Sequence, residues 1–176
     1  MIAVVGSANM DLITSVVELP RPGETVLGSS LMRAAGGKGA NQAVAAARAG
    51  GEVAFVGRVG DDESGSTLLQ ALQAAGVGTN HVVIDKGHPT GLALITVNDQ
   101  GENTIVVVSG ANGEVSSADV ERASAALRAS SYLVMQLEIP LEAVAHAADS
   151  AARLTVKVIL NAAPARPLPT SLLEQV

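Results

Sequence analysis

Short apolar runs alternate with longer Ala- and Leu-rich segments along most of this chain, and this alternation constrains the fold more than any other feature. The apolar runs predict strands at 2–5, 53–56, 132–137 and 156–160. The segments between them predict helices at 40–49, 67–75, 116–128 and 141–153. Strands linked through helices pair side by side in one direction, so we expect an α/β fold with a parallel sheet and flanking helices.

Two stretches interrupt this order. Residues 12–33 contain strand-like pieces at 12–17 and 25–31 around a Pro- and Gly-rich turn. Residues 91–109 have the pattern of a β-hairpin, with strands at 92–97 and 104–108 joined by a polar turn. We expect these four strands to form a small separate sheet that projects from the α/β body.

Composition excludes several classes of function. Hydrophobic residues make up 48% of the chain and charged residues 16%, a composition sufficient for a buried core. The volume of that core must come from Val, Leu, Ile and Ala, because the chain has one Phe, one Tyr and no Trp. The absence of Cys excludes disulfides, thiolate metal sites and a Cys nucleophile. A net charge of −6 without a basic patch disfavours a nucleic-acid partner. No leader or long apolar segment is evident, so we expect a cytoplasmic protein with no membrane partner.

The last residues resemble the start of a helix, at 169–174, and the chain ends at Val176. A parallel sheet of about four strands with an unfinished βα unit would leave an open apolar edge, which proteins normally cover. We therefore expect this chain to be the N-terminal part of a longer domain.

Polar side chains recur where the predicted strands end. Asn9 and Asp11 follow the first strand two positions apart, so in extended backbone they face the same side. Glu138 follows the third strand and Asn161 the fourth. Taken singly, each is equally typical of a turn or a helix cap. Together they favour a polar ligand, because ligands of open α/β sheets bind outside the carboxyl ends of the strands.

A glycine-rich segment, 36–42, leads into the first predicted helix. It suits either a tight turn or a close approach of backbone to a ligand. It is no Walker A loop, because Arg33 and Gly39 occupy positions where that motif has Gly and Ser or Thr. The acidic run 61–63 is typical of a helix N-terminus more than of a cation site. The three His residues have no metal-ligand spacing.

These segments resemble the ribokinase-like family of carbohydrate and nucleoside kinases over essentially the whole chain. The most specific match is the run 36–43, which resembles the family's first signature. The other matching pieces lie at 6–11, 22–25, 60–65, 101–103, 110–112, 135–138 and 161–166.

The resemblance implies a Rossmann-like α/β body and a β-sheet lid, with lid strands roughly within 12–33 and 91–109, that covers the sugar and mediates homodimerisation. It also implies which residues bind the substrate. Asn9 and Asp11 would bind ribose hydroxyls, Glu138 would contact the sugar from the third strand, and the same pocket would be lined by Gly37, Lys38 and Asn41.

The implied reaction transfers the γ-phosphate of ATP to the 5-hydroxyl of ribose, with Mg²⁺ and a monovalent cation such as K⁺. The family's catalytic Asp lies in a Gly-Ala-Gly-Asp-type segment that residues 1–176 do not contain. We therefore expect no catalytic residue, metal ligand or ATP pocket in this chain, and no activity from it alone. The alternatives are a non-catalytic sugar-binding or dimerising remnant and a related kinase with another sugar. A dinucleotide-binding oxidoreductase would share the general fold, but the chain lacks its glycine fingerprint.

Overall fold

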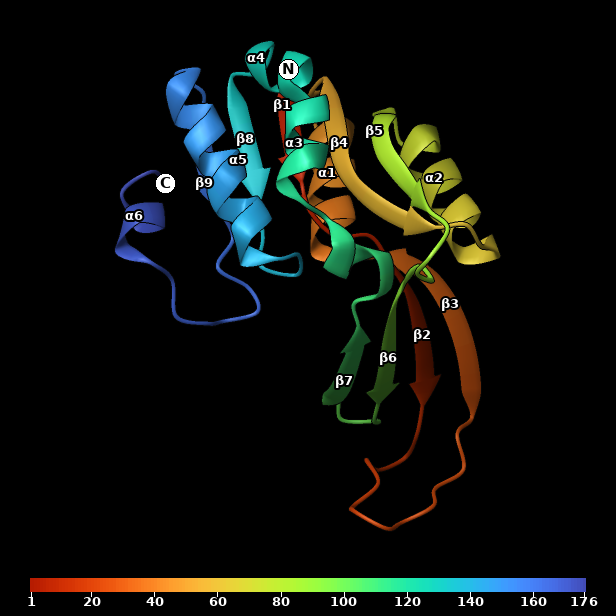
Figure 1. Ribbon diagram of the computed structural model, residues 1–176. Helices are drawn as coiled ribbons and strands as arrows, with labels where there is room; N and C mark the ends of the chain where they lie inside the picture. The colour runs from red at the N-terminus through yellow and green to blue at the C-terminus, as the bar shows by residue number, and fades with distance from the viewer.

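The computed structural model describes all 176 residues, which form two sheets with helices on both faces of the larger one (Figure 1). The larger sheet is entirely parallel, with strand order β5-β4-β1-β8-β9. Its strands are β1 (Ile2–Val5), β4 (Val53–Gly60), β5 (Val77–Asp85), β8 (Tyr132–Met135) and β9 (Lys157–Leu160). The central strands β1 and β8 are continuous apolar runs of the sequence, as expected for strands covered on both faces.

Helices cover each face of this sheet and bury a separate apolar cluster. On one face, α1 (Lys38–Arg48) and α2 (Glu63–Ala74) pack over a cluster that includes the lone Phe55. On the other face, α3 (Ser117–Arg122), α4 (Ser124–Arg128) and α5 (Leu141–Arg153) cover a larger cluster. Many helix residues in these clusters are alanines, which lets the helices lie close to the sheet. No helix is both long and apolar enough to cross a membrane.

The smaller sheet projects beyond the carboxyl ends of the parallel strands (Figure 1). Its order is β3-β2-β6-β7, with strands β2 (Asn9–Ser15), β3 (Ser30–Gly36), β6 (Gly91–Val97) and β7 (Asn103–Val108). The pairs β2–β3 and β6–β7 are antiparallel, whereas β2 and β6 are parallel. Two short helical segments, η1 (Gly110–Glu114) and α6 (Thr170–Leu173), complete the fold.

The structure confirms the parallel α/β body and the separate small sheet, and it corrects several details. The strand expected at 12–17 is β2, which begins at Asn9 and ends at Ser15. The sheet has a fifth strand, β5, which the sequence did not indicate because the first half of this edge strand contains Gly, Thr, Asn and His at 78–81. The strand expected at 25–31 is β3, Ser30–Gly36, because the Pro- and Gly-rich residues before it form an irregular loop. The helix expected over 116–128 is divided at Ala123, whose φ of −92° and ψ of 7° end α3.

Helix capping follows the sequence closely. Asp62 is the N-cap of α2 and accepts a hydrogen bond from the backbone N–H of Gly65 at 2.7 Å. The interpretation of the acidic run as a helix N-terminus is therefore correct, although the helix begins at Glu63 and not at Thr67. Ser116 and Asp119 form a capping box at the start of α3.

A charged cluster joins the parallel sheet to α3 close to the small sheet. Arg58 of β4 donates to Asp119 and to Asp85 of β5, each at 2.9 Å. The Asp119 side chain is fully buried. Hydrogen bonds from the backbone N–H of Gly87 and from Arg58 lower the pKa of Asp85 to about 2. The cluster therefore contains a guanidinium and two carboxylates, each with a charged partner.

Candidate functional site

A cavity of about 650 Å³ lies between the carboxyl ends of the parallel strands and one face of the small sheet. Its volume is within the range of small-ligand pockets. The small sheet contributes an apolar wall of Ala93, Ile95, Ile105 and Val107. The cavity is lined by all six residues that the family resemblance implied as substrate-binding, namely Asn9, Asp11, Gly37, Lys38, Asn41 and Glu138.

Asn9 and Asp11 reach the cavity because both belong to β2, where alternate residues share a face. Asn9 is 3% exposed, and its Oδ1 accepts a hydrogen bond from Nδ2 of Asn112 at 2.7 Å. Asn112 also bonds both backbone groups of Ala8, at 2.9 and 3.0 Å. The hydrogen bond from Asn112 fixes the orientation of the Asn9 side-chain amide through its oxygen. The amide nitrogen of Asn9 donates to no group of the protein.

The Asp11 carboxylate accepts no hydrogen bond from the protein, although the residue is half-buried. Burial and the nearby Glu138 carboxylate raise the pKa of Asp11, and Lys38 opposes the shift. The carboxylate lies against Gly36, where any Cβ would approach Asp11 Oδ2 to 2.1 Å. Asp11 is thus an acceptor with free lone pairs at the cavity wall, which suits ligand hydroxyls.

Glu138 connects three segments of the site. Its Oε2 accepts hydrogen bonds from Ser7 Oγ at 2.6 Å and from the backbone N–H of Lys38 at 3.0 Å. The ammonium nitrogen of Lys38 lies 3.6 Å from Oε1. The Glu138 side chain is only 11% exposed, so it has a fixed orientation and presents Oε1 to the cavity together with Lys38.

The glycine-rich segment approaches β2 very closely at the start of α1. Gly37 has a φ of 90°, and a Cβ there would lie 2.7 Å from the backbone nitrogen of Asn9. Ser7 holds the first turn of the helix, since its carbonyl accepts from the N–H of Ala40 at 2.8 Å. The segment therefore requires glycine both for its backbone conformation and for this contact.

Three residues of the site were not predicted from the sequence, and one predicted residue, Asn161, lies elsewhere. Ser7 and Asn112 were within matching motifs, but buried hydrogen-bond partners cannot be recognised before the chain is folded. Arg166 lines the cavity and was also not singled out. Asn161 is exposed and is not part of the cavity wall. Its backbone N–H donates to the carbonyl of Met135, and the chain then turns away from the cavity.

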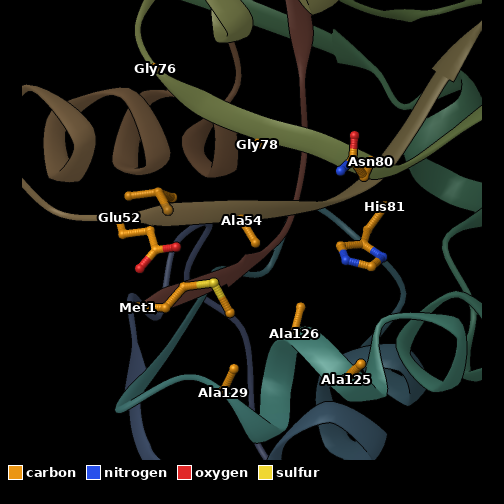
Figure 2. A pocket seen from close by; sticks show the side chains of 11 residues that line it. Met1, Glu52, Ala54, Gly76, Gly78, Asn80, His81, Ala125, Ala126 and Ala129 are labelled. Atoms are coloured by element: carbon orange, nitrogen blue, oxygen red, sulfur yellow. The ribbon is translucent and has the colours of Figure 1, made fainter.

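A second cavity, of about 430 Å³, lies at the amino ends of β4 and β5 (Figure 2). Met1, Glu52 and His81 line it, opposite alanines of α4. It contains none of the predicted site residues, and it is at the end of the sheet opposite to where α/β proteins bind ligands. No group of three or more His, Asp or Glu side chains in the chain could hold a metal ion. The first cavity is therefore the candidate site.

Comparison with known proteins identifies the family. The family model described as "pfkB family carbohydrate kinase" matches residues 1–176. This chain belongs to the pfkB family of carbohydrate kinases. It is 45% identical to ribokinase of Haemophilus influenzae over 98% of its length and 39% identical to deoxyribokinase of Salmonella typhi over 93%.

The fold agrees with this assignment. The structure of Arabidopsis thaliana ribokinase complexed with ribose and ATP superposes on 99% of the chain with a TM-score of 0.86 and 34% identity. The chain covers 57% of that structure, and 56% and 54% of the two relatives in sequence. This pfkB-family chain thus spans somewhat more than half the length of the proteins it matches.

Proposed function

We propose that the intact protein phosphorylates D-ribose to ribose 5-phosphate with ATP, and that residues 1–176 supply the sugar-binding part. The observation that carries this proposal is the Asp11 carboxylate, which faces the cavity without a hydrogen bond from the protein. Asn9, whose amide nitrogen has no partner in the protein, lines the same cavity from two residues earlier on β2. A carboxylate acceptor next to an amide donor matches neighbouring hydroxyls of a pentose.

In the proposed complex each wall of the cavity has a separate role. Asn9 and Asp11 bind hydroxyls from the small sheet, and Glu138 with Lys38 contacts the sugar from the parallel body. Gly37 and Asn41 complete the polar wall. The apolar wall of the small sheet covers the sugar as a lid and excludes water, which limits transfer of phosphate to water in place of the sugar.

Transfer forms a bond between the 5-oxygen of ribose and the γ-phosphorus, breaks the bond to ADP, and moves the hydroxyl proton to a base. We assign no residue of this chain as that base. We propose that the base lies in a Gly-Ala-Gly-Asp-type segment of the intact protein outside residues 1–176, as the family resemblance implies, together with the ATP site. Mg²⁺ and K⁺ are proposed cofactors of the intact protein, and they have no ligand assigned among these residues. ATP as donor is supported by the Arabidopsis ribokinase complex.

We also propose a cytoplasmic homodimer that forms through the small sheet. On the face of this sheet opposite the cavity, Leu31 and Val106 are more than half exposed and Leu94 is 45% exposed. Exposed apolar groups gathered on one sheet are typical of an interaction surface. Sedimentation equilibrium of the intact protein should give a dimer, and Val106→Glu should shift it toward monomer. A wild-type protein that is monomeric at micromolar concentration would contradict this part of the proposal.

A sugar panel with the intact protein tests the substrate. Coupled detection of ADP should give the highest kcat/KM with ribose, ahead of 2-deoxyribose and fructose. 2-Deoxyribose is included because deoxyribokinase of Salmonella typhi is among the relatives. A preference for fructose or deoxyribose would overturn ribose as the substrate. Ribose binding without any ADP release would favour the alternative, a non-catalytic sugar-binding or dimerising remnant.

A further inference from the structure

We infer that Arg166 recognises the phosphate of the phosphorylated sugar in this cavity, an inference that rests on the proposed function. The cavity wall contains four charged side chains, namely Asp11, Lys38, Glu138 and Arg166. Two of them, Lys38 and Glu138, face each other at 3.6 Å. Arg166 forms no hydrogen bond or ion pair with any group of the protein, so its charge is available to a ligand.

The place of Arg166 in the fold separates it from the groups proposed to bind sugar hydroxyls. Asn9 and Asp11 come from β2 of the small sheet, whereas Arg166 follows β9 on the parallel body. The backbone N–H of Leu137 donates to the carbonyl of Ala163 at 2.9 Å, which ties the Arg166 loop to the segment that carries Glu138. Arg166 therefore extends from an anchored loop at the cavity wall.

The chemistry of the guanidinium group decides which ligand atoms it favours. A neutral sugar offers hydroxyls, which the carboxylates and amides of the cavity already match. A phosphate group offers paired anionic oxygens, and the planar fork of an arginine binds these in bidentate fashion. Because Asp11 and Glu138 repel an anion, a phosphorylated sugar requires a cation that neither carboxylate neutralises. Arg166 is the cavity residue that meets this condition, since Lys38 is paired with Glu138.

Titration calorimetry of the intact protein with ribose and with ribose 5-phosphate tests the inference. Arg166→Gln should weaken the binding of ribose 5-phosphate by about tenfold or more, as expected for loss of a charge-assisted hydrogen bond. The affinity for ribose should change by less than about twofold. Arg166→Lys should retain part of the affinity. Arg128→Gln is the matched control, because Arg128 is also exposed and unpaired but lies on α4, outside the cavity.

The two ligands separate failure of this inference from failure of the proposed function. If the wild-type protein binds ribose but Arg166→Gln leaves ribose 5-phosphate affinity unchanged, Arg166 is a solvent-facing side chain and the inference is wrong. An equal loss for both ligands would also overturn it, since Arg166 would then act on the whole cavity. If the wild-type protein binds neither ligand, the proposed function fails, and the inference fails with it.

Discussion

Replacing Asn112 with alanine should weaken both the fold and the binding of sugar. Asn112 is 1% exposed, and its amide makes three hydrogen bonds to the start of β2. Two of them satisfy the N–H and C=O of Ala8, and the third holds the side-chain oxygen of Asn9. Asn112→Ala removes all three, and Ala8 is itself fully buried.

The magnitude follows from the groups left without partners. A buried polar group that loses its hydrogen bond costs about 1–3 kcal/mol. Two backbone groups of Ala8 lose theirs, so the free energy of unfolding should fall by about 2–6 kcal/mol, less where water enters the space. The Asn9 amide would also lose the contact that fixes its orientation. Ribose affinity should fall by about tenfold, the equivalent of one lost hydrogen bond to the sugar.

The measurements are urea unfolding and ribose titration of the intact protein, with Asn98→Ala as control. Asn98 is also buried and makes three side-chain hydrogen bonds, but all lie within the β6–β7 turn. Both variants should be less stable, and Asn112→Ala alone should bind ribose more weakly. The reasoning is refuted if the two variants bind ribose equally well, because Asn112 would then have a structural role only.

Three further predictions concern the site and its support. Asp11→Asn should raise the free energy of unfolding at neutral pH, because the raised pKa of Asp11 means that its ionised carboxylate opposes folding. The same variant should abolish ribose binding. A loss of stability that accompanies the loss of binding would contradict this prediction. Gly37→Ala should cost about 1–3 kcal/mol in urea unfolding and exceed Gly50→Ala, where φ is 91° but no atom lies within 4 Å of the added Cβ. The low pKa of Asp85 contributes stability above about pH 4 that is lost as pH falls toward 2, so Asp85→Asn should flatten that part of the pH–stability profile.

The sequence predicted the parts of the fold that depend on local pattern. The strands β1 and β8 are continuous apolar runs, and β4 begins with one, because helices cover both faces of this part of the sheet. The gathering of Asn9, Asp11 and Glu138 followed from topology alone, since parallel strands end at one edge of the sheet. Their arrangement in one cavity therefore needed no information on side-chain contacts.

The remainder could not be predicted, because it depends on contacts between distant segments. The edge strand β5 pairs on one side only and carries polar residues, so its pattern resembles a loop. Asn112 is 103 residues from Asn9 in the chain, and no local signal connects them. Arg166 lies in an irregular segment after β9, and only the folded chain places it beside the cavity.

The division of the site between two sheets explains why its polar groups are held so differently. On the parallel body, Glu138 is fixed by hydrogen bonds from Ser7 and from the backbone of Lys38. On the small sheet, Asp11 has no such partner, and its carboxylate is left half-buried with a raised pKa. A half-buried carboxylate without hydrogen-bond donors opposes folding. Proteins retain such a group, at a cost in stability, at sites where a ligand supplies the donors. Sugar hydroxyls that donate to Asp11 and contact Glu138 would join the two sheets, and the binding energy would then hold the small sheet over the cavity.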